Sequence, residues 1–328
     1  MQRVLVTGGA GYVGSHTCKS LADHGYVPVT VDNFSSGHMA TVRWGPLERG
    51  DINDRAFLDR VLAEHRPVAV LHFAGFSQVG ESVREPAKYY ANNVAGTLAL
   101  LEALRSNGPR KVVFSSSCAT YGQPGCLPIK ESDPQAPVNP YGRTKLAVEH
   151  LLHDYCAAYG IRTVALRYFN AAGAEAEAGI GEAHETETHL IPLVIETALA
   201  RRGPLEIFGD DYPTPDGTCQ RDYVHVADLA EAHALALRFL DWSPGFHAFN
   251  LGTGRAYSVR EVVASVERIT RRSIPVRIAA RRPGDPPVLV ADTRAAETAL
   301  GWSPQRSSLD EIVRSAWGWH ASELRFAG

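Results

Sequence analysis

The amino-acid sequence predicts an α/β fold, a doubly wound parallel sheet followed by a smaller C-terminal α/β lobe. Short runs rich in β-branched residues alternate with amphipathic stretches of helical length through the first half of the chain. This alternation favours a parallel sheet with helices on both of its faces. The chain has 328 residues, more than a typical single domain, so a second lobe is expected.

The first predicted unit is a strand, a glycine-rich turn and a helix. The run RVLVT at residues 3–7 is short and apolar, and GGAGYVG follows at 8–14 before a segment compatible with a helix. Gly8, Gly11 and Gly14 stand three residues apart, which is tighter than the usual dinucleotide fingerprint. Glycines in such a turn let the backbone approach a pyrophosphate bound at the free N–H groups of the helix. A tight turn without a ligand would explain the same glycines, so the segment that follows is needed to choose between the two interpretations.

The second predicted strand, VPVTV at residues 27–31, ends at Asp32. In a dinucleotide-binding unit of the Rossmann type, an acidic residue is expected at about this distance from the glycines. Its carboxylate accepts hydrogen bonds from ribose hydroxyls and would repel a 2′-phosphate, so the sequence favours NAD over NADP. The alternative interpretation is that Asp32 is only a turn residue before Asn33.

Three more strands are predicted at 68–73, 111–115 and 163–167, with helices at 85–105 and 140–159 between them. Ligands of doubly wound sheets bind beyond the carboxyl ends of the strands. We therefore expect one crevice to be lined by the residues at these ends, namely Gly11, Asp32, Asp51, Ala74, Ser115 to Ser117 and Tyr168.

Composition indicates where the two lobes meet. Small and acidic residues dominate from Ala171 to Glu187, and proline and glycine become frequent beyond them. We expect residues 1–175 to form the NAD-binding Rossmann domain, with later segments near 220–255 returning to it. Residues 176–328 are expected to form mainly a substrate-binding lobe.

Charge and composition argue against several classes of partner. With 33 Lys and Arg against 36 Asp and Glu, the net charge is −3, which gives no electrostatic reason to expect nucleic acid or an anionic membrane as a partner. No apolar run is long enough to span a bilayer. The first strand starts so close to Met1 that a secretory signal is not expected, and we predict a cytoplasmic location.

The five cysteines are odd in number and include no C-x-x-C pair. A disulfide framework and a zinc site are therefore not expected. We predict that all five are reduced packing residues and that the protein holds no metal. They are Cys18, Cys118, Cys126, Cys156 and Cys219.

A phenol and an ammonium lie four residues apart in the sequence YGRTK at 141–145. In a helix, Tyr141 and Lys145 share one face, one turn apart. A nearby cation favours the ionised phenol and lowers its pKa from the reference value of about 10, so Tyr141 is a candidate acid/base catalyst. Such pairs are common on helix surfaces. The glycine turn with Asp32 and the triple serine 115–117 at a strand end support the catalytic interpretation.

These features together resemble the extended short-chain dehydrogenase/reductases and, more narrowly, the UDP-glucose 4-epimerase family. The similar motifs occur in the same order over almost the whole chain, which makes the set more specific than any one motif. They are TGGAGYVGSH at 7–16, HFAG at 72–75, VGES at 79–82, NNVAGT at 92–97, FSSSCATYG at 114–122, YGRTK at 141–145, RYFNAAGA at 167–174, IFGDDYPTPDGTCQRDYVHV at 207–226, NLGTG at 250–254 and RRPGD at 281–285.

The resemblance implies a mechanism and the residues that perform it. Ser117 and Tyr141 would flank the 4-OH of a UDP-sugar, while Lys145 would hold the nicotinamide ribose and lower the pKa of Tyr141. Oxidation at C4 by NAD+ and return of the hydride to the other face of the 4-keto sugar would interconvert UDP-glucose and UDP-galactose. NAD is expected to stay tightly bound, because loss of NADH in mid-cycle would strand the ketone.

The resemblance also implies which residues bind the two nucleotides. Implied contacts to NAD are Gly8, Gly11, Tyr12, Val13, Gly14, Asp32, Asn33, Asp51, Ile52, Phe73, Ala74, Gly75, Asn92, Ser115, Tyr141, Lys145 and Tyr168. Implied contacts to the UDP-sugar are Ser117, Asn170, His189, Leu190, Phe208, Arg221, Arg282, Asp285 and Leu289. A homodimer built on the helices at 85–105 and 140–159 is implied as well.

Three positions vary within the resemblance. Ser77 stands where some relatives carry Lys, and His189 stands where others carry Asn, which affects one cofactor contact and the contacts to sugar hydroxyls. Leu289 falls at a gate beside the sugar C2 substituent, where a residue smaller than the Tyr of some members would leave room for an N-acetyl group. Alternatively, Leu289 only continues the apolar strand at 288–290.

Other activities stay open from the sequence. A 4-epimerase of another UDP-sugar, an N-acetylhexosamine or a pentose, is the nearest alternative. A sugar-nucleotide dehydratase would need an acid pair directly after Ser117, where Cys118 and Ala119 stand. A catalytically dead NAD-binding regulatory protein would tolerate the loss of Ser117, Tyr141 or Lys145, and all three are present.

Overall fold

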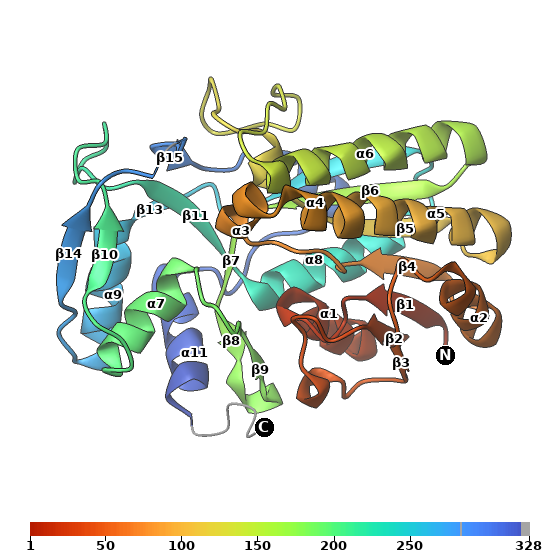
Figure 1. Cartoon of the computed structure of the whole chain (residues 1–328), viewed down its shortest axis with the longest axis horizontal. Coiled ribbons are helices and arrows are strands. Elements are labelled where there is room, and N and C mark those ends of the chain that lie inside the picture. The colour runs from red at the N-terminus through yellow and green to blue at the C-terminus, as the bar shows by residue number, and fades with distance from the viewer. Residues whose placement is uncertain (283, 323–328) are drawn as a thin grey trace.

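The computed structural model describes residues 1–282 and 284–322, and a seven-stranded sheet forms its centre (Figure 1). The strands lie in the order β12-β6-β5-β4-β1-β2-β3, and every neighbouring pair is parallel. The chain starts near the middle of the sheet, moves to one edge and then returns past β1 to the other edge, which confirms the predicted doubly wound order. The bounds are β1 Arg3–Thr7, β2 Val27–Asp32, β3 Leu47–Arg49, β4 Ala69–His72, β5 Lys111–Ser117, β6 Arg162–Tyr168 and β12 Phe246–Leu251.

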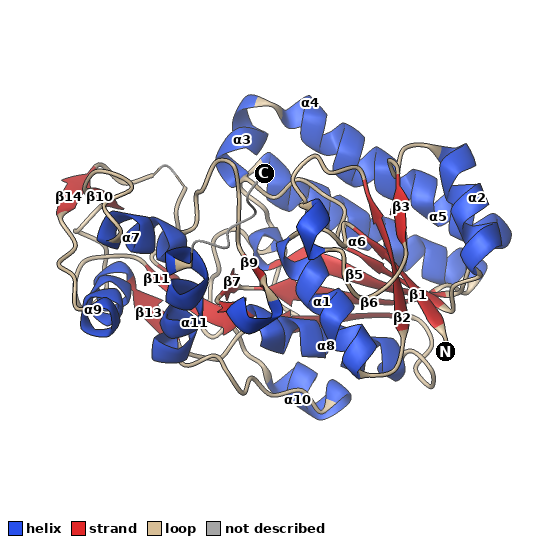
Figure 2. Cartoon of the chain, turned by 90° about the horizontal axis from the view of Figure 1, so that it is seen from below, coloured by secondary structure: helices blue, strands red, loops and turns tan. Residues whose placement is uncertain are grey.

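Helices cover both faces of this sheet (Figure 2). On one face, α1, α8 and α10 pack against the strands in a buried cluster that includes Leu21, Leu237 and Leu300. On the other face, α2, α5 and α6 contribute Leu58, Leu104 and neighbouring residues to a second cluster. Because both faces are covered, the strands are almost continuously apolar. The bounds are α1 Tyr12–Asp23, α2 Arg55–His65, α5 Gly96–Asn107, α6 Pro140–Tyr159, α8 Val226–Phe239 and α10 Arg294–Leu300.

The segment between β4 and β5 is helical, but the prediction of one helix over 85–105 is wrong. The chain forms α3 Val79–Arg84, α4 Pro86–Tyr89, a π-helical turn at Tyr90–Ala95 and then α5. Pro86 begins a new helix because it has no N–H to continue the previous one. Asn93 of the π turn is buried, and its side chain binds both the N–H and the carbonyl of Phe76, at 2.8 and 3.0 Å. The wider turn therefore anchors the loop that follows β4.

The remaining elements form a smaller α/β lobe. Its central strand β11 pairs in parallel with β7 and β15 and antiparallel with β13, while β10 and β14 form a separate parallel pair. Helices α7, α9 and α11 enclose its apolar core. α8 and β12, which lie between β11 and β13 in the sequence, pack into the first lobe. The bounds are β7 Asn170–Ala172, β8 Ala174–Glu175, β9 Ile180–Gly181, α7 Leu190–Ala198, β10 Leu205–Phe208, β11 Gln220–His225, β13 Ala256–Ser258, α9 Val259–Thr270, β14 Val276–Ala279, β15 Val288–Leu289 and α11 Leu309–Ala321.

Pro283 of the RRPGD motif and residues 323–328 of the expected second lobe lie outside the described residues. Within the described part of the chain, no helix is long and apolar enough to cross a membrane. All five cysteines are unpaired. Cys126 is exposed in the loop between β5 and α6, so the prediction that every cysteine is a packing residue is wrong for this one.

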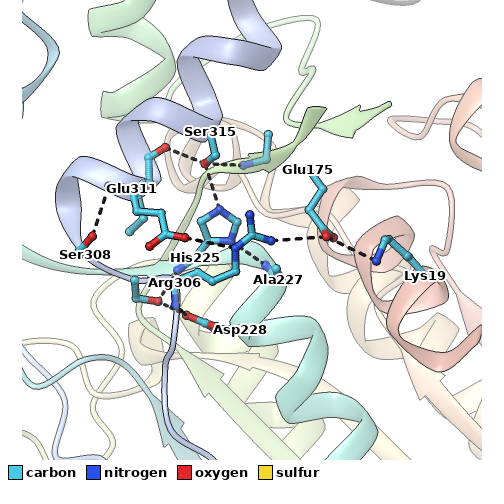
Figure 3. A network of polar contacts seen from close by, with 12 residues as sticks. Lys19, Glu175, His225, Ala227, Asp228, Arg306, Ser308, Glu311 and Ser315 are labelled. Atoms are coloured by element: carbon cyan, nitrogen blue, oxygen red, sulfur yellow. Dashed lines mark hydrogen bonds and ion pairs between the residues drawn. The ribbon is translucent and has the colours of Figure 1, made fainter. Parts of the chain in front are cut away.

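A buried histidine joins α11 to the end of β11 (Figure 3). His225 Nδ1 accepts a hydrogen bond from Ala227 N at 3.1 Å, so the proton resides on Nε2, which donates to Ser315 Oγ at 3.0 Å. Burial lowers the pKa of His225 to about 3, which keeps the ring neutral as this pattern requires. Ser315 Oγ in turn donates to Ile312 O at 2.9 Å. The network holds α11 against the strand that leads into α8.

Beside this histidine, Arg306 connects the lobes through charge (Figure 3). Its guanidinium lies 3.5 Å from Glu175 and 3.4 Å from Glu311 of α11. Glu175 also faces Lys19 of α1 at 3.5 Å. These groups are partly exposed, so we expect them to orient the lobes more than to stabilise them.

A second buried network holds α6 against the sheet. Glu149 of α6 and Arg167 of β6 are 2% and 4% exposed, and Arg167 Nη2 lies 2.6 Å from the Glu149 carboxylate. Arg167 Nη1 donates to Tyr121 Oη at 2.7 Å, and the Ser116 hydroxyl donates to Glu149. Both charges are thus paired and hydrogen-bonded away from water, which gives α6 one position relative to β5 and β6.

We predict that Glu149→Leu lowers the free energy of unfolding by about 3–5 kcal/mol, because Arg167 would stay buried without a counter-charge. Urea denaturation at neutral pH measures this change. The control is Asp23→Asn, which removes the exposed partner of Lys19 in α1 and should cost about 1 kcal/mol or less. Equal losses in the two variants would contradict a structural role for the buried pair.

Candidate active site

A cleft of about 970 Å³ lies at the carboxyl ends of the sheet strands, and both lobes line it. Nearly all residues predicted to bind a cofactor or substrate meet there. From the first lobe they are Gly8, Gly11, Tyr12, Val13, Gly14, Asp32, Asn33, Ile52, Phe73, Ala74, Gly75, Asn92, Ser115, Ser117, Tyr141, Lys145 and Tyr168, and from the segments beyond it they are Asn170, His189, Leu190, Phe208, Arg221, Arg282, Asp285 and Leu289. Ser77 also lines the cleft.

Asp51 is the exception, since it does not line the cleft. Its carboxylate accepts a hydrogen bond from Asn33 Nδ2 at 2.8 Å and another from Asn53 N at 2.8 Å. Asp51 therefore orients Asn33, and its predicted contact with NAD stays a prediction.

The glycine turn brings three backbone segments into contact. Gly8 has a φ of +72°, and a Cβ there would lie 2.6 Å from Ala74 N at the end of β4. Gly14 lies in the first turn of α1. A Cβ there would lie 2.2 Å from Gly8 O, so only glycine fits at this position. Gly11 is the N-cap of α1 and supplies no capping side chain. The first N–H groups of α1 are left for another acceptor, as a pyrophosphate site requires.

Asp32 at the end of β2 serves two roles. Its two carboxylate oxygens accept hydrogen bonds from Ala10 N at 3.0 Å and Phe34 N at 2.8 Å, so it is a turn residue as the alternative interpretation held. Each oxygen keeps a second lone pair, and the residue faces the cleft. Burial raises the pKa of Asp32, with the backbone hydrogen bonds to Phe34 and Ala10 acting in the opposite direction. The lone pairs left on its two oxygens can accept hydrogen bonds from ribose hydroxyls.

The start of α6 places Tyr141 and Lys145 on the cleft. Asn139 caps the helix by accepting a hydrogen bond from Gly142 N at 2.9 Å, and Pro140 follows in the first turn. Ser82 Oγ of α3 accepts from Tyr141 N at 3.2 Å. The helix runs over 140–159 as predicted.

Ser117 closes the other side of this arrangement. It is the last residue of β5, and its Oγ accepts a hydrogen bond from Ala119 N at 3.1 Å. A short turn over Cys118–Thr120 follows directly. The hydroxyl is therefore held at the strand end, where it acts to lower the pKa of the Tyr141 phenol.

Burial shifts the pKa values of both Tyr141 and Lys145. Lys145 Nζ donates to Ser115 O at 2.7 Å and lies 5.8 Å from the centre of the Tyr141 ring. Burial raises the pKa of Tyr141 to about 12, against the hydrogen bond with Ser117, and burial lowers the pKa of Lys145 to about 8. Burial is thus the largest influence on the pKa of the Tyr141 phenol, and the effect of Lys145 on that pKa stays a prediction.

The C-terminal lobe supplies the opposite wall. Arg221 of β11 forms an ion pair with Asp285 and donates to Gln220 O at 2.7 Å. The Arg282 guanidinium lies 4.0 Å from the centre of the Phe208 ring. Four residues predicted to bind substrate therefore already form two interacting pairs.

Leu289 of β15 pairs with Arg221 in register and packs beside a small apolar cluster that includes Tyr121 and Phe169. It also lines the cleft. Leu289 is therefore a strand residue and a residue of the cleft wall at the same time. Asn170 begins β7, and His189 and Leu190 begin α7.

Several residues at the site escaped sequence reasoning. Asn93 lies next to the predicted Asn92 and donates to Thr144 Oγ1 at 3.2 Å. His233 of α8 contacts the Tyr168 hydroxyl through its Nε2 atom. Its Nδ1 atom lies 2.8 Å from Leu229 O. Their signal in the sequence was weak, because a buried Asn or His in a helix has no distinctive spacing. The acidic and histidine residues between β9 and α7 were also missed, apart from His189.

The chain is similar to known proteins over almost its whole length. The model of the NAD dependent epimerase/dehydratase family matches residues 4–252. The UDP-glucose 4-epimerase of Rhizobium leguminosarum bv. trifolii is 55% identical over 320 residues, with 98% of each chain covered. The crystal structure of UDP-glucose 4-epimerase from Brucella ovis in complex with NAD superposes with a TM-score of 0.94 at 56% identity, covering 97% of this chain and 98% of that one.

More distant solved structures have the same fold. The UDP-Glc/GlcNAc 4-epimerase of Campylobacter jejuni has a TM-score of 0.86 at 36% identity, covering 98% of this chain and 99% of that one. With the family model over most of the chain and close relatives over nearly all of it, the chain belongs to the NAD dependent epimerase/dehydratase family and, within it, to the UDP-glucose 4-epimerases.

Proposed function

We propose that the protein interconverts UDP-glucose and UDP-galactose by oxidation and reduction at C4 of the sugar, with NAD as a tightly bound cofactor. The convergence of Ser117, Tyr141 and Lys145 in one cleft with a dinucleotide cradle carries this proposal. The names of the relatives support it, and the similar structure from Bifidobacterium longum is described as a complex with NAD+ and UDP.

The first lobe fits NAD at two points. The uncapped N-terminus of α1 behind the close contact of Gly8 and Gly14 suits a pyrophosphate, and the Asp32 carboxylate suits an adenosine ribose. Bound NAD+ would supply the hydride acceptor and a positive charge in the cleft. Lys145, whose Nζ donates to Ser115 O, would hold the adjoining ribose.

Tyr141 and Ser117 handle the proton of the 4-OH. With a pKa of about 12 the phenol is protonated at neutral pH. A further cation beside the ring would lower that pKa and let Tyr141 accept the proton. Ser117, fixed by Ala119 N at 3.1 Å, can hold the sugar hydroxyl in line with the phenol.

The position after Ser117 argues against a dehydratase. Cys118 is buried, and burial raises its pKa to about 12, so it stays a neutral thiol. Ala119 has no ionisable group. No acid pair therefore stands where C5 deprotonation and loss of the C6 hydroxyl would need one.

We also infer that the protein is a cytoplasmic homodimer of galactose metabolism. The helices at 79–107 and 140–159 leave large apolar side chains exposed, and α3 packs against α6. An exposed apolar surface on neighbouring helices suits a helical interface between two copies. The exposed residues are Val79, Val83, Tyr90, Leu98 and Tyr159.

Purified protein should convert UDP-galactose to UDP-glucose without added nicotinamide, because the cofactor is regenerated in each cycle. Denaturing the protein should release NAD or NADH, which chromatography measures. A 4-keto-6-deoxy product would indicate a dehydratase, and an unchanged sugar would indicate a regulatory protein. Protein that releases no nicotinamide nucleotide and depends on added NADP would refute the proposal.

Tyr141→Phe should keep the fold and the bound cofactor but lose roughly 10²–10⁴-fold in kcat, since general acid–base groups contribute this much. Steady-state kinetics measure the loss, and nucleotide release confirms the cofactor. Tyr26→Phe is the control, because it removes a hydroxyl from a tyrosine between α1 and β2 that does not line the cleft. A Tyr141→Phe variant with more than about a tenth of wild-type kcat would contradict the assigned role.

A second substrate is favoured by one observation. Leu289 lines the cleft with a side chain that is smaller than Tyr and has no hydroxyl. We propose that the wall leaves space for an N-acetyl group at C2 of the sugar. The similar enzyme from Campylobacter jejuni is described as acting on both UDP-Glc and UDP-GlcNAc.

Wild type should therefore turn over UDP-N-acetylglucosamine as well as UDP-glucose, and Leu289→Tyr should abolish only the first activity. The comparison is of kcat/KM for both sugars in both proteins, with UDP-glucose as the internal control. Undetectable turnover of the acetylated sugar by wild type, or equal loss of both activities in the variant, would show that residue 289 does not set this choice.

A further inference from the structure

A histidine buried in α8 contacts two aromatic residues that line the cleft. His233 is 0% exposed, and the centre of its ring lies 4.6 Å from that of Phe73 and 5.4 Å from that of Tyr168. Phe73 and Tyr168 both line the cleft. Neither the proposed proton transfer nor the proposed cofactor contacts use this histidine. It is a buried titratable group in direct contact with the cleft wall.

The proton of His233 resides on Nδ1. This atom lies 2.8 Å from Leu229 O, one turn earlier in α8, and a carbonyl oxygen can only accept a hydrogen bond. Burial lowers the pKa of His233 to about 4, against the hydrogen bond to Leu229, so the ring is neutral at neutral pH and carries a single proton. Nε2 of His233 is therefore an acceptor.

The donor to this acceptor is the Tyr168 hydroxyl, which contacts His233 Nε2. A phenol has one proton, so the proton of Tyr168 points at His233. Burial raises the pKa of Tyr168, with Ser115 acting in the opposite direction, and the phenol keeps this proton at neutral pH. What the Tyr168 oxygen can offer to a ligand in the cleft is a lone pair. Toward the cleft, Tyr168 is an acceptor and not a donor.

Tyr168 lies beside the residues proposed to perform the reaction. It is the last residue of β6 and pairs in register with Ser117 of β5. Tyr141 is close enough to act on the pKa of Tyr168 through its charge. Lys145 Nζ donates to Ser115 O in the same neighbouring strand. The acceptor of Tyr168 is therefore next to the site of the proposed hydride transfer.

The order of the strands separates this acceptor from the predicted adenosine site. β6 and β2, which ends at Asp32, are four strand spacings apart in the sheet. At about 4.8 Å for each spacing, the two strand ends are roughly 19 Å apart. A dinucleotide with its adenosine ribose at Asp32 would bring its nicotinamide end toward β5 and β6.

The chemistry of the nicotinamide indicates which of its groups would meet Tyr168. The carboxamide N–H₂ has two donors and no acceptor, so it needs an acceptor as its partner. A ribose hydroxyl can donate or accept and would bind a tyrosine in either orientation. A tyrosine whose proton is held elsewhere therefore suits the carboxamide best.

We propose that His233 is a positioning residue, which accepts the hydrogen bond of the Tyr168 hydroxyl so that the Tyr168 oxygen accepts one from the carboxamide N–H₂ of the nicotinamide. This inference rests on the proposed function, which brings NAD into the cleft. A fixed carboxamide orients the nicotinamide ring toward the sugar C4. Without His233, the phenol proton could turn toward the cleft, where it would oppose the N–H₂ group as donor against donor.

Retention of nicotinamide tests the proposal without any sugar present. The purified protein is dialysed in urea below its unfolding transition, and the nucleotide that stays bound is measured over time. His233→Leu should lose nicotinamide roughly tenfold faster than wild type, as expected for a lost hydrogen bond in a buried site. His233→Gln should restore retention, because its amide oxygen can accept from the Tyr168 hydroxyl. The control is His320→Leu in α11, a buried histidine that does not line the cleft and should behave as wild type.

A double-mutant cycle separates this role from packing. Tyr168→Phe should lose nicotinamide about as fast as His233→Leu, and the double variant should lose it no faster, because both changes remove the same hydrogen bond to the carboxamide. Additive effects of the two substitutions would overturn the proposal. So would equal losses in His233→Leu and His233→Gln when both are folded.

Turnover of UDP-galactose supplies a second measurement. In His233→Leu, kcat should fall with little change in KM, since the histidine acts on the orientation of the cofactor and not on the sugar nucleotide. Fluorescence of bound NADH should also increase during turnover. A misoriented ring returns its hydride to the ketone less often, and the 4-keto sugar then leaves the cleft. A change in KM alone would contradict the assigned role.

Folding and the proposed function are tested separately. Thermal unfolding shows whether each variant is folded. If His233→Leu is not, Tyr168→Phe still decides the matter, because unchanged retention in that variant would overturn the proposal. Wild type that retains NAD but does not epimerise UDP-galactose would refute the proposed function, whereas the difference in retention between His233→Leu and His233→Gln would still support the role of this histidine.

Discussion

The buried ion pair of Glu149 and Arg167 is the contact on which the active-site geometry depends. It joins the middle of α6 to β6, and Ser116 of β5 binds the same carboxylate. Three neighbouring elements therefore keep one relative position, and so do the Tyr141 phenol and the Lys145 ammonium at the start of α6. A buried charge that loses its partner is costly, so this arrangement has few alternatives.

Other contacts hold the first turn of α6 from different directions. Asn139 caps the helix, Ser82 of α3 binds Tyr141 N, and Asn93 of the π turn reaches Thr144. Each contact comes from a different segment at the carboxyl ends of the strands. Contacts of this kind preorganise the side chains of this turn, which reduces the rearrangement that a bound ligand would require.

Desolvation is the main electrostatic effect in the cleft. It raises the pKa of Tyr141 to about 12 and lowers the pKa of Lys145 to about 8, so each is shifted toward its neutral form. At the opposite wall, burial acts to lower the pKa of His184, but the Glu182 and Glu187 carboxylates outweigh it and raise that pKa to about 10. The Glu182 carboxylate lies 3.2 Å from His184 Nδ1, so a direct contact there offsets the cost of burial.

The parts of the fold that depend on local pattern could be predicted from the sequence. The glycine turn, the strand ending at Asp32 and the helix over 140–159 follow from short-range constraints, namely φ > 0, apolar runs and a capped N-terminus. The parallel order of the sheet followed from the alternation of strands and helices. The division between the lobes at residue 175 stays a prediction. α8 and β12 lie beyond that residue in the sequence and pack in the first lobe, so a single boundary does not separate the two lobes.

Some features depend on contacts between segments that are far apart in the sequence. Only the tertiary structure decided these features. The π turn around Asn93 exists because Phe76 offers both of its backbone groups to that side chain. The contact of Asp51 with Asn33 joins the segments that follow β3 and β2. The pKa of Tyr141 depends on how much water burial removes, and the charges of the histidines at the cleft depend on carboxylates buried behind them. Residue spacing determines which groups can be neighbours along a helix or strand, but burial and long-range partners decide which ionisation state those groups adopt.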